Sequence, residues 1–154
     1  ATRAQIESTT NKINEWVCAF ADGATSYISW KFVLPDNWDG AALVGVIVWH
    51  TAATTNNMRW QVDAVMRGDS DALDTSFTAG AGAAGAVDEA ADGTTLDLNY
   101  SAAISFTPGG TLAGGKEIVV RVARMGAHAN DTCTGIGYFH EMKLEYGITG
   151  SLSA

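Results

Sequence analysis

The chain has 154 residues, a formal net charge of −8 and nine scattered basic residues. The negative charge and the few basic residues argue against a nucleic-acid partner, because duplex binding needs Lys and Arg to neutralise phosphates. Its longest apolar run, 41–49, is far shorter than the roughly 20 residues that span a bilayer, and residues 1–8 lack the apolar core of a secretory signal. We therefore expect a single soluble domain, made in a cytoplasm, with no nucleic-acid or membrane partner.

The first 15 residues are polar and carry Ile6 and Ile13 as their regularly placed apolar anchors. This segment, 1–15, is predicted to be an N-terminal arm, either extended or a short helix. From Trp16 the pattern changes, and residues 16–20 followed by Asp22 and Gly23 predict a short strand that ends in a turn. The folded domain is therefore expected to begin at Trp16.

Residues 25–34 alternate clearly between apolar and polar side chains. Ile28, Trp30, Phe32 and Leu34 share one face, which predicts a strand closed by the turn at 35–37. Residues 41–51 are almost wholly apolar and β-branched, as in a central strand that is covered on both faces. Residues 58–67 alternate again after a polar turn, so we expect 41–51 and 58–67 to form a long antiparallel hairpin.

The second half of the chain begins with an Ala/Gly-rich stretch, 80–93, which reads as a long loop or a weak edge strand. Residues 95–106 return to strand character, with a bulge expected near Ala102 and Ala103. A further strand is predicted over 117–124. The final strand, 136–146, keeps a period of two for its whole length, with Tyr138, His140, Met142 and Leu144 expected on one buried side.

Eight predicted strands joined by turns favour an all-β fold, an antiparallel sandwich of two sheets and of jelly-roll type, with a closed barrel as the alternative. The predicted sandwich domain spans 16–147, and residues 148–154 form a small-residue C-terminal tail.

Several residues could carry chemistry. Asp69, Asp71 and Asp74 could supply oxygen ligands to calcium, but without the full calcium-loop pattern a solvated acidic loop is favoured. The overlapping tripeptide 67–69 matches a cell-adhesion motif that is short enough to occur by chance. Cys18 and Cys133 lie outside any zinc-binding spacing and are predicted to be ordinary thiols, with one disulfide left open.

No nucleophile motif accompanies His50, His128 and His140, so we predict that the protein is not an enzyme and binds no cofactor or metal. All five tryptophans lie in the first 60 residues. Most are expected in the core, whereas Trp38, in a Pro-Asp-Asn-Trp-Asp-Gly turn, is the one well placed to meet a ligand. Trp38 and Tyr27 are therefore the candidate contacts if the protein binds glycans.

An ordered set of segments resembles a family of jelly-roll virion proteins from tailed bacteriophages. The segments read YISWKFVLPDNWDG at 27–40, VIVW at 46–49, MRWQV at 58–62, VRVAR at 120–124 and NDTCTG at 130–135, with a closing strand that ends at Tyr146. The resemblance spans about 16–147.

This resemblance implies a capsid decoration, or cement, protein on the outer surface of the virion head. Such a protein would bind the major capsid protein as a homotrimer and stabilise the shell. The arm would then reach over the shell, with Arg3, Ile6 and Ile13 as the candidate shell contacts. The alternative that the resemblance leaves open is a receptor-binding or glycan-binding module associated with a tail or fibre.

Overall fold

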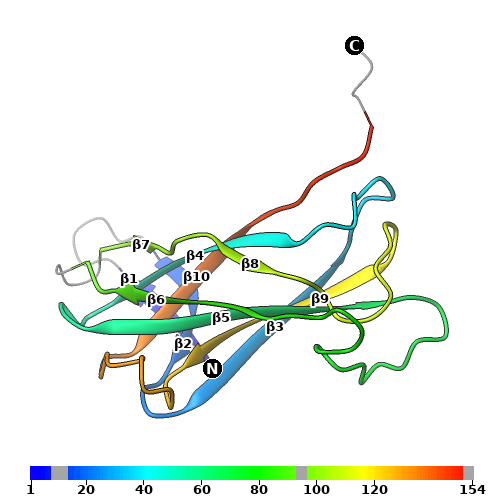
Figure 1. Ribbon diagram of the computed structural model, residues 1–154. Helices are drawn as coiled ribbons and strands as arrows, with labels where there is room; N and C mark the ends of the chain where they lie inside the picture. The colour runs from blue at the N-terminus through cyan, green and yellow to red at the C-terminus, as the bar shows by residue number, and fades with distance from the viewer. Residues whose placement is uncertain (8–13, 93–96, 151–154) are drawn as a thin grey trace.

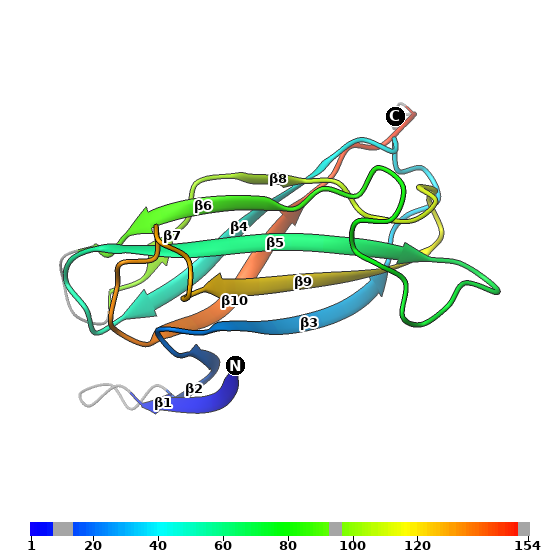
Figure 2. The same cartoon turned by 60° about the horizontal axis from the view of Figure 1, so that its bottom comes forward.

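The computed structural model describes residues 1–7, 14–92 and 97–150, and these form ten strands in two facing sheets (Figures 1 and 2). The first sheet has the order β1-β2-β10-β4-β7, with β8 also paired to β4, and the second has the order β3-β9-β5-β6. Every pairing between these strands is antiparallel. The predicted antiparallel sandwich of two sheets is therefore confirmed.

The strands of the first sheet are β1 (Thr2–Glu7), β2 (Asn14–Phe20), β4 (Leu43–Thr51), β7 (Asn99–Tyr100), β8 (Ile104–Phe106) and β10 (Gly137–Glu145). Those of the second sheet are β3 (Thr25–Val33), β5 (Asn57–Arg67), β6 (Gly85–Ala90) and β9 (Glu117–Met125).

The core between the sheets is built from aromatic side chains that meet across the sandwich. Trp49 on β4 and Trp60 on β5 are fully buried with ring centroids 5.8 Å apart, and Phe20 on β2 meets Trp60 edge to face at 5.4 Å. Such tilted and edge-on contacts stabilise the core beyond the effect of burying the rings. Leu34, from the predicted apolar face of 25–34, completes one end of this core.

Strands β4 and β5 do not form the predicted hairpin. The short link between them crosses from one sheet to the other, and the two strands lie in opposite layers. A short polar connection can serve either as a hairpin turn or as a crossing between two sheets. The turn sequence alone therefore does not indicate which of the two forms. The prediction of a central strand at 41–51 is confirmed, since β4 pairs with β10 on one side and with β7 and β8 on the other.

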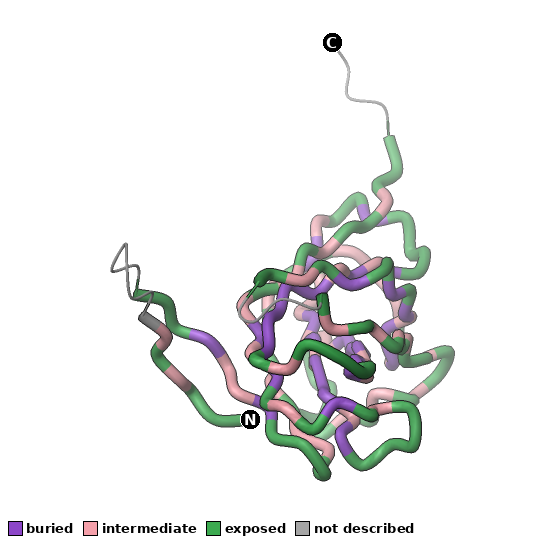
Figure 3. Tube along the Cα trace, turned by 90° about the vertical axis from the view of Figure 1, so that its left-hand side faces the viewer, coloured by how far each residue is buried: buried purple, intermediate pink, exposed green. Residues whose placement is uncertain are grey.

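The N-terminal segment is a strand and not a helix. Residues 2–7 pair with 14–19 in a regular ladder, so β2 begins before the predicted boundary at Trp16. Figure 3 shows this hairpin standing apart from the body of the sandwich, to which it is joined where β2 pairs with β10 over three residues. The hairpin therefore extends the first sheet beyond the edge of the second.

The C-terminal boundary of the domain also differs from the one predicted at residue 147. Ile148 forms an isolated bridge with Trp38, and the backbone of Thr149 donates a hydrogen bond to the carbonyl of Asn37 at 2.7 Å. Residues 148 and 149 of the predicted tail are therefore attached to the domain, and residues 151–154 lie outside the described part of the chain.

Strand β10 contains a β-bulge that reverses its alternation. Phe139 pairs with Trp49, but the next pair along the ladder joins Glu141 to Val48, so His140 is the extra residue. Before the bulge Gly137 and Phe139 face the core, and after it Met142 and Leu144 do so. The expectation that Tyr138, His140, Met142 and Leu144 share one buried side is therefore wrong, because the inserted residue shifts the period by one.

Candidate functional site

A line of three polar side chains crosses the outer face of the first sheet, the face turned away from the core. The Nδ1 atom of His50 on β4 lies 2.6 Å from Nε2 of His140 on β10. The Nδ1 atom of His140 lies 3.0 Å from a carboxylate oxygen of Glu15 on β2. Neighbouring strands thus bring together two histidines that are 90 residues apart in the sequence.

The hydrogen bonds fix which nitrogens carry protons when both rings are neutral. An ionised Glu15 can only accept, so His140 donates through Nδ1 and its Nε2 then accepts from Nδ1 of His50. The remaining Nε2 of His50 is buried and has no partner in the described part of the chain. Burial lowers the pKa of His50 to about 4, with a smaller contribution from His140, while Glu15 opposes the shift.

Tyr138 covers the other side of this pair. Its ring stacks on that of His50 with centroids 4.7 Å apart and planes inclined by 17°. His50 itself is only 2% exposed. The pair is therefore held rigidly between Tyr138 and the sheet, and only its Glu15 end reaches solvent.

The bulge in β10 places a second carboxylate on this outer face. With His140 inserted, Glu141 lies opposite Val48 of β4, and Val48 in turn lies opposite Tyr100 of β7. Residues that are directly opposite on adjacent strands project to the same side of a sheet. Glu141, Val48 and Tyr100 thus form a row across three strands, beside the end of the histidine pair.

A groove of about 370 Å³ runs along this row. It is lined by Glu15, Trp16, Val48, Leu98, Tyr100, His140 and Glu141. Trp16 and Tyr100, which are 58% and 66% exposed, are therefore two aromatic residues of the groove lining that the fold does not bury. Exposed aromatics beside convergent polar groups are typical of a ligand-binding surface.

The structure does not bring the two predicted glycan contacts together. Trp38 is 5% exposed and belongs to the core cluster, which corrects the prediction that its turn presents it to a ligand. The backbone of this turn forms an isolated bridge with Ile148. Tyr27 is half exposed, but it lies on β3 in the opposite sheet, far from the groove in the strand order.

Tyr27 instead takes part in an arginine sandwich on the outer face of the second sheet. The guanidinium of Arg121 on β9 lies between the rings of Tyr27 and Phe77, at 4.5 and 4.0 Å from their centroids. The same guanidinium binds both carboxylate oxygens of Asp63, at 2.8 and 2.5 Å. This arrangement fastens the loop that carries Phe77 onto the sheet.

Of the predicted shell contacts, Arg3 and Ile6 lie on β1, and Ile13 lies outside the described residues. Arg3 is exposed and stacks over the indole of Trp16 at 3.9 Å from the ring centroid. Ile6 is half-buried. Both residues belong to the projecting hairpin.

The acidic loop has a structural role at one of its three positions. The carboxylate of Asp71 accepts the backbone N–H of Gly68 at 2.7 Å and closes a turn. No group of three or more His, Cys, Asp or Glu within 1–7, 14–92 and 97–150 is placed to hold a metal. Arg67 of the adhesion-like tripeptide pairs with Glu117 and with the carbonyl of Leu73, so its guanidinium is not presented for recognition.

Cys18 and Cys133 are both free in the described chain, as predicted. Cys133 is buried in the core cluster, Cys18 packs against the same cluster, and the carbonyl of Cys133 accepts a hydrogen bond from Arg124.

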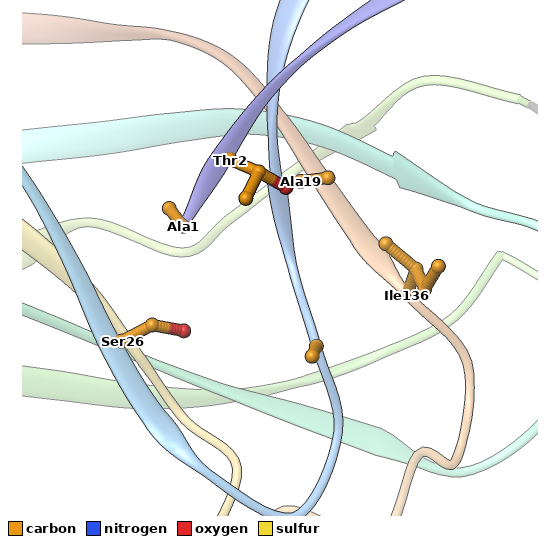
Figure 4. Close-up of a pocket in the computed structure, with 6 residues that line it drawn as sticks. Ala1, Thr2, Ala19, Ser26 and Ile136 are labelled. Atoms are coloured by element: carbon orange, nitrogen blue, oxygen red, sulfur yellow. The ribbon is translucent and has the colours of Figure 1, made fainter.

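A second, smaller hollow of about 160 Å³ lies near the start of β1. Figure 4 shows its lining, which comes from both ends of the hairpin, from β3 and from the segment before β10: Ala1, Thr2, Ala19, Ala21, Ser26 and Ile136. The polar side chains here are the hydroxyls of Thr2 and Ser26. These side chains carry no titratable group, so the groove on the first sheet is the better candidate site.

Trp16, Tyr100 and Glu141 belong to the groove although no sequence pattern marks them as members of a site. Trp16 was counted among the tryptophans and expected to start a strand, and Tyr100 and Glu141 were seen only as strand residues. Their proximity depends on the order β2-β10-β4-β7, which no periodicity in the chain reveals.

Comparisons with known proteins found no matching family model, no similar curated protein and no similar solved structure. Over the described ranges, no helix has the length and apolar character that crossing a bilayer requires.

Proposed function

We propose that the protein is a non-enzymatic structural protein of a phage virion, most simply a capsid decoration protein that binds the outer shell. The sequence resemblance described above supplies the shell as the partner. The observation that carries the proposal is strand β1 of the projecting hairpin, which adds no side chain to the core cluster.

The hairpin presents a free strand edge. β1 pairs with β2 on one side only, and its other edge has no strand beside it in the described chain. Exposed edges of this kind pair readily with a strand of another protein, and proteins that do not use them commonly shield them. Such an edge is suited to joining this sandwich to a strand of a capsid subunit.

The hairpin also carries the side chains that would fix its position on a partner. Arg3 offers an exposed cation that is held in place by Trp16, and Ile6 offers partly exposed apolar area on the opposite face of the strand. The major capsid protein is the proposed partner, and the sandwich is proposed to assemble as a homotrimer.

Binding of an assembled shell stabilises it by mass action. A protein that binds several neighbouring subunits, and binds dissociated subunits less well, shifts the equilibrium towards the shell. Because β1 is already paired with β2, it has less conformational entropy to lose on binding than an unpaired arm would have, which favours affinity.

The histidine pair supports a non-enzymatic role. A nucleophile would have to lie within hydrogen-bond reach of an activating base. Here the line from Glu15 through His140 ends at the buried Nε2 of His50, which contacts no nucleophile among the described residues. The arrangement joins β2, β10 and β4 through contacts between side chains.

The test is co-sedimentation with capsids assembled without this protein, with light scattering to measure its mass in free solution. We expect saturable binding by a trimer, weakened by Arg3→Glu and by Ile6→Asp. Leu73→Asp is the matched control, since Leu73 is 85% exposed in a loop of the second sheet. Absence of shell binding by a correctly folded protein would overturn the capsid role and favour a tail or fibre location.

A further inference from the structure

Most of the residues that line the groove on the first sheet lie on paired strands, and this pairing fixes their positions relative to one another. Glu141, Val48 and Tyr100 come from three adjacent strands in one row, and Val48 is almost fully buried at its floor. Glu15 reaches the same groove from β2 and is oriented by its contact with His140. Side chains on paired strands are held more precisely than those on loops.

The rims of the groove expose aromatic surface that the fold leaves uncovered. Tyr100, Trp16 and Leu98 are among the most exposed large apolar side chains in the molecule, and all three line this one groove. Arg3 stacks over the Trp16 indole and fixes its orientation, yet Trp16 remains 58% exposed. Exposed apolar side chains that gather in one place mark a binding surface, whereas isolated ones do not.

The polar groups between these aromatics determine the kind of ligand. The groove contains two carboxylates, Glu15 and Glu141, and no Lys or Arg among its lining residues. Carboxylates accept hydrogen bonds from hydroxyl groups and repel anions. The buried His50 behind them stays neutral down to low pH, because burial lowers its pKa to about 4, so it adds no positive charge.

A pyranose sugar has the matching chemistry. One face of its ring consists of C–H groups, which pack against the electron-rich face of an aromatic ring, and its rim carries hydroxyl donors. The groove volume of about 370 Å³ falls within the range of pockets that bind small ligands.

We propose that this groove binds a neutral pyranose unit of a glycan, stacked on Tyr100 and donating hydroxyl hydrogen bonds to Glu15 and Glu141. The site is independent of the shell-binding role, because it uses the outer face of the sheet and not the free edge of β1. It would give the protein affinity for a saccharide surface wherever in a virion the protein is located.

The experiment is saturation-transfer NMR on the full chain with the methyl glycosides of glucose, galactose, mannose and N-acetylglucosamine. Methyl glucuronide serves as the charged counterpart of methyl glucoside. We expect at least one neutral glycoside to bind with a Kd on the order of 1 mM, as a ligand of this size allows, and the glucuronide to bind more weakly.

Two variants connect binding to the groove. Tyr100→Ala is expected to weaken binding roughly tenfold, whereas Tyr146→Ala removes a similarly exposed tyrosine outside the groove and leaves the Kd unchanged. Glu141→Gln keeps the side-chain shape and is expected to reduce the preference for the neutral sugar over the glucuronide.

The proposal is overturned if no neutral glycoside shows saturation transfer, if the glucuronide binds as well as the glucoside, or if Tyr100→Ala binds like the unaltered protein. Tyr100 lies on β7, away from β1 in the strand order, so Tyr100→Ala is expected to weaken glycan binding and to leave shell binding unchanged. The failure of one role is therefore distinguishable from the failure of the other.

Discussion

The Nδ1 atom of His50 and the Nε2 atom of His140 are 2.6 Å apart, so two histidines from adjacent strands share a hydrogen bond that one of them must donate. The bond joins β4 in the centre of the first sheet to β10, and Glu15 extends it to β2. Because His50 is buried, the network depends on that ring staying neutral.

His50 gives the fold a defined pH dependence. Its pKa is about 4 in the folded protein and 6.5 in its ordinary environment, so the unfolded chain binds the proton more readily. The contribution of His50 to the free energy of unfolding is fully present above pH 6.5, decreases as the pH falls, and is lost near pH 4. The loss amounts to about 3 kcal/mol.

The measurement is urea unfolding of the unaltered protein and of His50→Phe at several pH values. The variant is expected to lose less stability between pH 6.5 and 4 than the unaltered protein does. Subtracting the pH profile of the variant from that of the unaltered protein removes the contribution of the carboxylates, which also titrate near pH 4. His128→Gln, a change at an exposed histidine, should leave the profile as it is. Identical profiles for His50→Phe and the unaltered protein would contradict the assignment.

Arg124 and Asp131 form a buried ion pair that organises the connection between β9 and β10. Both side chains are fully buried, their closest N–O distance is 2.8 Å, and Arg124 also donates to the carbonyls of Phe20 and Cys133. Asp131→Ala leaves the buried arginine with only the more exposed carboxylate of Asp22, 3.6 Å away, so we expect the free energy of unfolding to fall by about 3–5 kcal/mol.

The matched control for this change is Lys143→Ala, which breaks the exposed pair with Glu145. Exposed pairs contribute about 0–1 kcal/mol, so the control is expected to have little effect. Equal losses in the two variants, measured by chemical denaturation, would show that Asp131 does not neutralise Arg124 as described.

Arg121→Lys tests the arginine sandwich on the second sheet. Lysine keeps the charge but loses both the stacking between Tyr27 and Phe77 and the two-point contact with Asp63. We expect a loss of about 1–2 kcal/mol, together with faster proteolytic cleavage in the segment 68–84. Arg59→Lys, at a more exposed pair with Asp88, should leave the cleavage rate unchanged.

Gly85 at the start of β6 is required because backbone approaches it closely. A Cβ atom there would be 2.1 Å from the carbonyl oxygen of Ser105, which cannot move without displacing β8. Gly85→Ala is expected to lower the melting temperature through a loss of about 2 kcal/mol or more. Ala86→Thr, at the exposed next position, should melt like the unaltered protein.

Deletion of residues 1–12 should leave the sandwich folded. β1 pairs with β2 alone and adds no side chain to the core cluster, so the melting temperature is expected to change by only a few degrees. Shell binding is expected to weaken in the co-sedimentation assay. A deleted protein that is unfolded by circular dichroism, or that binds shells undiminished, would contradict the assignment of the hairpin.

The sequence predicted best the strands whose alternation is regular. Residues 25–33 form β3 with Ile28, Trp30 and Phe32 turned to the core, and the Ala/Gly-rich stretch does contain an edge strand, β6. The described part of the chain has ten strands where eight were expected, partly because β1 is too polar to show a buried face and partly because the predicted strand 95–106 is replaced by β7 and β8.

The candidate groove was beyond prediction for two physical reasons. One inserted residue at His140 changes the face on which Glu141 lies, and a bulge leaves no distinctive residue pattern there. The partners of β10 are β2 and β4, which lie more than 80 residues away, and only the complete strand order shows that Trp16 and Tyr100 flank the same surface.

The position of β10 between β2 and β4 also determines when this protein can fold during its synthesis. β10 pairs with both β2 and β4, so the edge of β2 that faces away from β1 and one edge of β4 have no partner until β10 has left the ribosome. Until then the apolar strand β4 has an open edge, which is the state most prone to aggregate. A nascent chain of this topology gains most from a chaperone that shields residues 43–51 before β10 emerges.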